Sequence, residues 1–353
     1  MEYTFRTPDD MHVHFRQGEM LKTVVSYTAG VFRRALVMPN TTPAILTGDD
    51  VRRYQTEIMK AVHDCFKPLK VASAYERFQP LMTIKLTGDT TPMMIEDAFE
   101  AGAIAVKLYP EGVTTNSEDG VSVENIEKLY PVFRAMANCG MVLSVHGEVP
   151  GVPILRRESA FLAIFNKLAS DLPELKITLE HITTSDAVNA VMSARDGVAA
   201  TITLHHLILT VDDILAYKHN GAEGLNPHNY CKPVAKNVSD REALLAAAFS
   251  GSKKFFLGSD TAPHLRGKKE CSCGCAGVWN APVLVPLLVE VFHRCRKIEC
   301  LESFMSEFGA EHYGLQPNSG TITYTDIQPV RITDELHGIV PFWAGKEVAW
   351  ARI

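Results

Sequence analysis

The sequence predicts an α/β protein, a (β/α)8 or TIM barrel followed by a short extension of helix and β-strand. Three observations lead to this prediction. Eight short apolar runs recur along the chain, helical patterns lie between them, and nearly every run ends at a polar residue. Strands and helices that alternate in this number are typical of a closed parallel barrel.

The eight runs are short and often β-branched, and glycine, proline or polar residues bound them, as in buried strands. In chain order they are 11–14, 34–38, 81–86, 103–106, 141–145, 175–179, 198–204 and 255–257. A doubly wound open sheet is the alternative, but its polar strand ends would spread along an edge and meet mainly at the switch point. In a barrel they converge on one mouth, so we favour the barrel.

Three segments between the strands carry helix signals. Apolar residues spaced three and four apart predict a helix over 123–136. The Thr-Ser-Asp sequence at 184 predicts an N-capped helix over 184–192. Ser239 and Glu242 predict a capping box that opens a helix over 239–249.

We expect one domain of the whole chain, 1–353, with the barrel over about 8–297 and the extension over about 298–353. In the extension, a helix over 298–315 should pack under the barrel. A β-rich tail over 322–352 should close the chain.

Composition limits the function classes. The chain of 353 residues is 46% hydrophobic and 22% charged, as in an ordinary soluble globule. Its net charge of −6 gives no reason to expect nucleic acid or an anionic membrane as a partner. Neither a signal-like start nor a run of 18 apolar residues occurs, so we expect a cytoplasmic protein.

The eight cysteines do not predict a disulfide framework, because most are scattered, as reduced cytosolic thiols are. Cys271, Cys273 and Cys275 lie close together, but their spacing is wrong for a closed structural zinc site. We therefore expect them to pack in a loop.

His12 and His14 are the first candidate functional residues. Alternate residues of a strand share a face, so the two imidazoles point the same way and suit a metal such as zinc. Such a pair is a weak signal by itself. It gains weight because His146, His181 and Asp260 each follow an apolar run of their own. Each of these three could also be an ordinary hydrogen-bonded residue at the barrel rim.

Lys107 ends another apolar run and has two interpretations. A lysine there can snorkel to the barrel rim and keep its charge in water. Alternatively, burial removes its proton and the neutral amine captures carbon dioxide as a carbamate, an anionic ligand able to bridge two metals. Metal-binding residue types at successive strand ends favour the second interpretation.

The segments that contain these residues resemble the class II (monofunctional) dihydroorotases of the binuclear metal amidohydrolase superfamily. The matching segments are 8–16 (PDDMHVHFR), 37–40 (VMPN), 105–110 (AVKLYP), 146–148 (HGE), 180–184 (EHITT), 258–264 (GSDTAPH) and 274–277 (GCAG). The resemblance runs from Pro8 to at least Pro341.

The resemblance implies reversible cyclisation of N-carbamoyl-L-aspartate to L-dihydroorotate, the third step of de novo pyrimidine (UMP) biosynthesis. It implies two Zn²⁺ per subunit, bridged by N6-carboxylated Lys107 and a hydroxide. It places one zinc on His12, His14, Lys107 and Asp260, and the second on Lys107, His146 and His181. Asp260 would be the catalytic acid and base. The only partners implied are the small-molecule substrate and a second copy of the chain in a homodimer.

The substrate carries a carboxylate, and the resemblance also implies the residues that bind it. Arg16, two residues past His14, offers a planar fork for the carboxylate, and Asn40 and His264 complete that pocket. Backbone groups near Lys232 and Ala276 would read the amide edge, although an apolar residue is common at position 232. The 111–120 segment has the composition of a mobile loop, in which Thr114 and Thr115 would form a lid over bound substrate.

Two other functions stay open on sequence alone. The chain could be another cyclic amidase, such as a hydantoinase or allantoinase. It could also be a non-catalytic dihydroorotase-like subunit, although such a subunit should have lost metal ligands and none is missing here.

Overall fold

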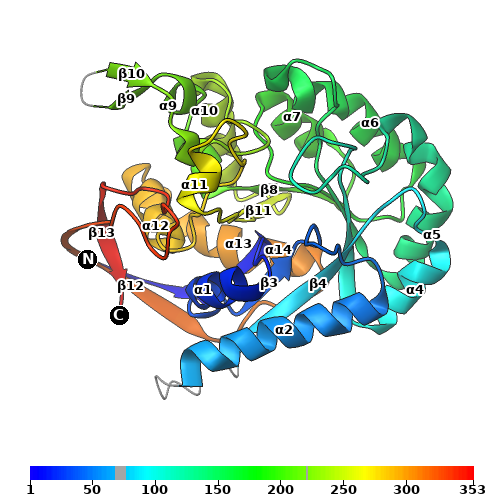
Figure 1. Ribbon diagram of the computed structural model, residues 1–353, viewed down its shortest axis with the longest axis horizontal. Coiled ribbons are helices and arrows are strands. Elements are labelled where there is room, and N and C mark those ends of the chain that lie inside the picture. The colour runs from blue at the N-terminus through cyan, green and yellow to red at the C-terminus, as the bar shows by residue number, and fades with distance from the viewer. Residues whose placement is uncertain (68–76, 220–221) are drawn as a thin grey trace.

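The computed structural model describes residues 1–67, 77–219 and 222–353, and eight parallel strands form its centre (Figure 1). The strands are β2 (Asp9–Val13), β3 (Arg34–Val37), β4 (Gln79–Lys85), β5 (Ala103–Leu108), β6 (Val142–Val145), β7 (Ile177–Leu179), β8 (Val198–Ile202) and β11 (Phe255–Leu257). Each coincides with one of the eight predicted runs. Every strand pairs with the next one along this series, as in a barrel.

The sheet closes on itself between β2 and the end of β11. Val13 and Thr261 form a parallel bridge, and the backbone N–H of His14 donates to the Thr261 carbonyl at 3.0 Å. The N–H of Asp260 donates to the His12 carbonyl at 2.9 Å. The predicted barrel is thus confirmed and the open sheet is wrong. Closure also places the His-Val-His strand directly beside Asp260.

Helices follow one another around the outside of the barrel (Figure 1). They are α1 (Gly18–Ala29), α2 (Gly48–Phe66), α4 (Pro92–Glu100), α5 (Tyr130–Cys139), α6 (Arg157–Asp171), α7 (Ser185–Ser193), α8 (Leu204–Ile208), α9 (Asp212–Leu215), α10 (Val238–Ala248), α11 (Arg266–Lys269) and α12 (Leu284–Arg294). A two-stranded hairpin, β9 (Tyr217–His219) with β10 (Ala222–Gly224), projects after α9. In the described ranges, no helix combines the length and hydropathy that crossing a membrane requires.

One predicted helix is confirmed and two need correction. Thr184 caps α7 as expected, because its hydroxyl accepts the Ala187 N–H at 3.1 Å. The predicted helix over 123–136 is instead a 3₁₀ helix (Val123–Leu129) that passes into α5 at Tyr130. Pro131 has no N–H to continue a single α-helix through this point, so it occupies the first turn of α5.

The predicted capping box at Ser239 and Glu242 is wrong. α10 begins at Val238, and the side chain of Asn237 accepts the Asp240 N–H at 3.0 Å. Asparagine is as good an N-cap as serine, so the helix starts at the earlier of two competing caps.

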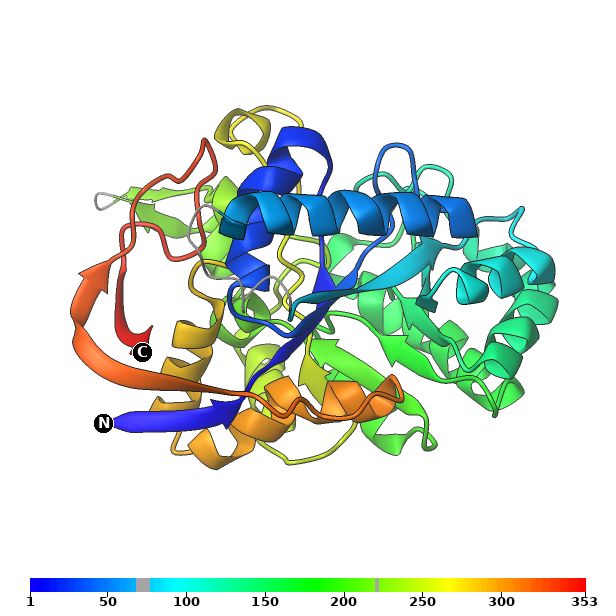
Figure 2. The ribbon, with the colours of Figure 1, turned by 90° about the horizontal axis from the view of Figure 1, so that it is seen from below.

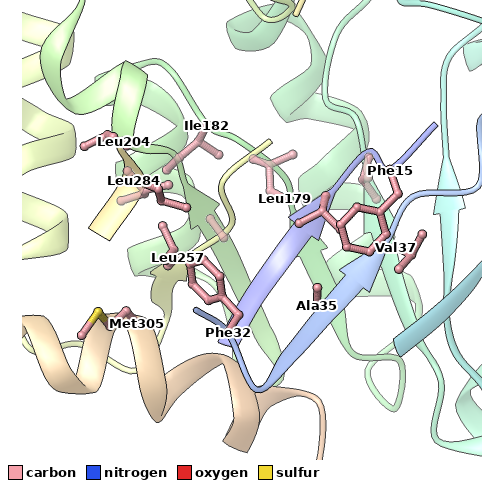
Figure 3. Close-up of a cluster of buried hydrophobic side chains, with 14 of the residues drawn as sticks. Phe15, Phe32, Ala35, Val37, Leu179, Ile182, Leu204, Leu257, Leu284 and Met305 are labelled. Carbon is pink, nitrogen blue, oxygen red and sulfur yellow. The ribbon is translucent and has the colours of Figure 1, made fainter. Parts of the chain in front are cut away.

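Two apolar layers stabilise the barrel, because alternate strand residues point inward and outward. Leu36 and Leu81 point into the barrel, whereas Val37 and Ile84 lie in the layer between strands and helices. Figure 3 shows part of this outer layer, where Leu257 of β11 lies near Leu284 of α12.

The predicted helix over 298–315 is broken into three pieces: a 3₁₀ helix (Ile298–Cys300), α13 (Leu301–Ser306) and α14 (Phe308–His312). The break falls at Glu307, whose φ of −123° is outside the helical range. As predicted, the segment packs under the barrel. Ala310 and Tyr313 join the inner apolar layer, and Gly309 is so close to Met11 that a Cβ there would lie 2.8 Å from its Cγ.

The predicted β-rich tail is confirmed, and it recruits a strand that the sequence did not indicate. β12 (Thr321–Arg331) and β13 (Glu347–Arg352) form an antiparallel sheet with β1 (Glu2–Arg6), in the order β1-β12-β13. Figure 2 shows β1 running beside β12 at one side of the molecule. The two ends of the chain therefore lie in the same sheet.

A buried ion pair joins the start of the barrel to the extension. Asp9 and Arg34 are register partners on β2 and β3. The Arg34 guanidinium donates to both oxygens of the Asp9 carboxylate, at 2.9 and 2.5 Å, and to the Gln316 carbonyl at 3.0 Å. The Asn318 side chain also donates to the Asp9 carboxylate, at 2.8 Å. This bidentate pair therefore holds two strands and the extension together.

Replacing Arg34 with Met should leave the Asp9 carboxylate buried without its cation. We expect the free energy of unfolding to fall by about 3–5 kcal/mol, the usual loss when one partner of a buried pair is removed. Urea unfolding followed by circular dichroism measures this loss. Arg33→Met, at the partly exposed preceding residue, should change it by less than about 0.5 kcal/mol. Equal effects of the two substitutions would show that the pair contributes little.

Candidate metal centre

The four histidines of the predicted metal set lie close to Asp260 or to one another at the carboxyl ends of the barrel strands. His12 and His14 both approach one oxygen of Asp260, with Nε2 to Oδ1 distances of 3.5 and 3.2 Å. The rings of His12 and His181 have centroids 5.1 Å apart, and those of His181 and His146 are 4.8 Å apart. All five side chains are buried. The predicted convergence on one mouth is therefore what the fold produces.

Two carboxylates that sequence reasoning missed fix the imidazole rings. Glu180 Oε2 lies 2.9 Å from His12 Nδ1, and Glu148 Oε2 lies 2.8 Å from His146 Nε2. Each carboxylate accepts the proton of one ring nitrogen and so leaves the other nitrogen unprotonated. That arrangement directs a lone pair of each ring toward the centre of the site. Both glutamates are within two residues of a predicted ligand, but only the fold shows what they contact.

Lys107 is enclosed among these groups. Its side chain has no exposed surface, and its Nζ has no hydrogen-bond partner in the described residues. The centroid of the Tyr109 ring lies 5.3 Å from Nζ. Burial lowers the pKa of Lys107 to about 8. A lysine that snorkels to the rim would reach water, and this one does not.

The donor set fits a metal site. Potential ligand atoms of His12, His14 and Asp260 lie within 4.8 Å of one another. Burial lowers the pKa of His14 to about 4, so its imidazole is neutral, as a metal ligand must be. Burial alone would raise the pKa of Asp260, but its hydrogen bond to His14 holds that pKa below its usual range. Neutral imidazoles beside an ionised carboxylate are suitable ligands for a divalent cation.

Backbone strain marks the same site. Arg16, His181 and Asp260 adopt positive φ angles of 63°, 41° and 45°, which cost residues other than glycine about 1–3 kcal/mol each. The His181 N–H donates to the Thr201 hydroxyl at 2.6 Å, and the Asp260 N–H donates to the His12 carbonyl. These hydrogen bonds hold the strained residues where their side chains face the site.

The predicted carboxylate-binding residues are adjacent to the metal-site candidates. Arg16 Nη2 lies 2.9 Å from His264 Nε2, and Arg16 Nε donates to the Pro263 carbonyl at 3.1 Å. The same His264 nitrogen lies 3.0 Å from the Ala276 carbonyl. One ring nitrogen cannot both accept from Arg16 and donate to Ala276, so His264 makes one of these two hydrogen bonds at a time. Burial and the Arg16 charge lower the pKa of His264 to about 3 and keep the ring neutral.

The loop predicted as a lid lies closed over this group. Asn40 Nδ2 donates to the Thr115 carbonyl at 3.1 Å, and Asn116 Nδ2 donates back to the Asn40 carbonyl at 2.9 Å. The cavity between this loop and Asp260 has a volume of about 20 Å³. Its lining includes all the predicted substrate-binding residues except His264: Arg16, Asn40, Thr114, Thr115, Lys232 and Ala276.

Two other groups of potential metal donors differ from this site. Cys271 and Cys273 are exposed, with Sγ atoms 3.2 Å apart, so neither thiol packs inside the loop as predicted. His205, His206 and Cys231 cluster in the interior, a group that the sequence analysis did not single out. There His206 Nε2 and Cys231 Sγ lie 3.1 and 3.3 Å from the Pro233 carbonyl, so the protein already supplies their partner.

Comparison with known proteins identifies the family to which the chain belongs. The model of the amidohydrolase family matches residues 10–324. A dihydroorotase of Shewanella pealeana is 44% identical over 99% of this chain and 98% of its own length. A dihydroorotase of Rhizobium johnstonii is 46% identical over 91% of this chain and 88% of its own.

A solved structure shows the same fold over the whole chain. The crystal structure of a Saccharomyces cerevisiae dihydroorotase in complex with 5-fluoroorotic acid superposes with a TM-score of 0.88 at 35% identity, covering 100% of this chain and 98% of that one. The chain belongs to the amidohydrolase family and, within it, to the dihydroorotases, which are cyclic amide hydrolases.

Proposed function

We propose that the chain interconverts N-carbamoyl-L-aspartate and L-dihydroorotate in the third step of de novo pyrimidine biosynthesis, as a cytoplasmic homodimer. The observation that carries this proposal is a buried Lys107 amine among histidines and Asp260, without a hydrogen-bond partner in the described part of the chain, with the Arg16 guanidinium nearby. The Lys107 amine, the histidines and Asp260 suit a metal centre that hydrolyses an amide. The Arg16 guanidinium suits a substrate that carries a carboxylate.

We propose that these residues hold two zinc ions. His12, His14, Asp260 and a carbamate on Lys107 would hold one, and the same carbamate with His146 and His181 would hold the other. When bound, the two metals supply Lewis acidity and make hydroxide available near neutral pH. In the described residues, the Lys107 amine has no hydrogen-bond partner, and this supports the carbamate. A carbamate at this position would supply the anionic metal ligand that the bare amine cannot be.

Asp260 is the group that would move the proton. Its hydrogen bond to His14 keeps it ionised in the resting site, so one carboxylate oxygen is free to accept the proton of the attacking water. The same carboxyl then protonates the amide nitrogen that leaves the ring. In the direction of ring closure, Asp260 removes the proton from that nitrogen first.

Arg16, Asn40 and His264 would orient the substrate through its carboxylate. Arg16 Nε donates to the Pro263 carbonyl, so the outer edge of the guanidinium can form a bidentate contact with the substrate carboxylate. Backbone groups of Ala276 and Lys232 would read the amide edge of the ring. Thr114 and Thr115 would donate their hydroxyls to bound substrate when the loop is closed and so exclude water.

The carboxylate pocket separates this function from the alternatives. A hydantoinase-like enzyme would accept cyclic ureides that lack a carboxylate, whereas Arg16 predicts that this chain requires one. A panel of cyclic ureides tests the difference. A non-catalytic subunit is disfavoured because His12, His14, Lys107, His146, His181 and Asp260 all keep metal-binding side chains.

Ring opening of L-dihydroorotate by the purified, metal-loaded chain tests the function, and Lys107→Ala tests the centre. Without the bridging group, at least one metal position should empty and turnover should be abolished, because both metals share this ligand. Metal analysis and ring-opening assays measure the two effects. Added short carboxylic acids should restore part of the activity by occupying the place of the carbamate. Two tightly held metals and near-normal turnover in Lys107→Ala would rule out the carbamate.

Arg16→Lys should keep its metals but bind substrate poorly, because lysine keeps the charge and loses the fork. Loss of a bidentate charged contact is worth about 2–5 kcal/mol, or about 30-fold or more in kcat/KM for dihydroorotate. Steady-state kinetics with a parallel metal analysis measure this. Unchanged kinetics would remove Arg16 from the carboxylate pocket.

A further inference from the structure

Lys85 is a second buried lysine of the barrel, and its partners come from the lid. It ends β4 on the inward face that it shares with Leu81, and its side chain is 2% exposed. Its Nζ donates to the Asn116 carbonyl at 2.8 Å and forms an ion pair with Asp119. In the described residues, no barrel group accepts a hydrogen bond from this ammonium.

Lys85 and Lys107 are register partners on β4 and β5, so two buried lysines lie at the same level of the barrel. Their surroundings differ in one respect. The Lys107 amine has no partner, whereas the Lys85 ammonium has two, both in the 111–120 loop. The 111–120 loop therefore supplies both acceptors that the described residues offer to the Lys85 ammonium.

A substrate that binds between the loop and Asp260 requires the loop to move. The space between them measures about 20 Å³, which is room for about one water molecule, and a more open pocket of about 130 Å³ shares His14, Arg16 and Asn40 with it. Asn40 lines that cavity and contacts the Thr115 carbonyl, so entering substrate must displace this contact. Lys85 does not line the cavity, so its contacts with Asn116 and Asp119 can form again above bound substrate.

Opening the loop takes both acceptors away from a buried cation. Asp119 itself is 58% exposed, so its carboxylate is well solvated in either position. The larger cost falls on Lys85, because a buried charged donor loses its partners. The closed loop therefore satisfies the Lys85 ammonium, and the open loop does not. We call the contacts of Lys85 with Asp119 and the Asn116 carbonyl the latch, because they favour the closed loop.

We propose that Lys85 is a positioning residue for the reaction, whose buried ammonium holds the lid closed through Asp119 and the Asn116 carbonyl. The closed lid places Thr114 and Thr115 against the substrate. This step of the inference rests on the proposed function, whereas the latch itself rests on the contacts of Lys85 alone.

Asp119→Asn tests the latch in the metal-loaded enzyme, with Glu118→Gln as the matched control. Glu118 is the neighbouring acid, is exposed, and forms no ion pair within the described ranges. We expect hydrogen exchange of the 111–120 peptide, measured without substrate, to be about ten-fold faster in Asp119→Asn than in wild type. In the same variant, kcat/KM for dihydroorotate should fall by about ten-fold. Glu118→Gln should change neither quantity.

The double variant Lys85→Met/Asp119→Asn separates a latch from a merely structural role. Both substitutions break the same latch, so kcat/KM of the double variant should be about as low as that of the more impaired single variant and not reduced by the product of the two effects. A double variant as impaired as the product of the two single variants would overturn the proposal, as would unchanged exchange in Asp119→Asn. Wild-type enzyme that holds metal but opens no dihydroorotate would instead count against the proposed function. The exchange result would still decide the latch.

Discussion

Hydrogen bonds between the first and the last barrel strand hold the whole site together. The Asp260 N–H donates to the His12 carbonyl at 2.9 Å, and the His14 N–H donates to the Thr261 carbonyl at 3.0 Å. These bonds join residues almost 250 positions apart in sequence and bring both histidines against the Asp260 carboxylate. Since Asp260 is held at a positive φ, the closure also determines the direction of its side chain. Without a closed barrel the metal ligands would not converge.

The interior of this barrel contains several ionisable groups that are paired with one another or with the lid. Asp9 pairs with Arg34 below the site, His12 and His146 form hydrogen bonds with Glu180 and Glu148, and Lys85 pairs with the lid. Lys107 differs from Arg34 and Lys85, because no described residue accepts a hydrogen bond from its amine. Because Arg34 and Lys85 have partners and the Lys107 amine has none in the described residues, we infer that Lys107 is the lysine that carries the carbamate.

The sequence predicted what local pattern can encode. The eight strands were predictable because each is a short apolar run with its own breaks, and His12, His14 and Asp260 because they end such runs. Contacts between segments that lie far apart in the sequence could not be predicted. Glu180 serves a histidine 168 positions away, β1 finds its partner only at β12, and the buried state of Lys85 depends on a loop 31–34 residues later. Helix starts were missed where two caps competed, as at Asn237 and Ser239.

The central claim is that the Lys107 amine is carboxylated in the working enzyme. Carbon-13 NMR tests it most directly, on protein loaded with zinc in ¹³C-labelled bicarbonate. The account predicts one carbamate carbon resonance in the active enzyme, lost on Lys107→Ala and retained on Lys85→Met, since among the described residues Lys85 has hydrogen-bond acceptors and Lys107 has none. An active, metal-loaded enzyme without any carbamate resonance would contradict it.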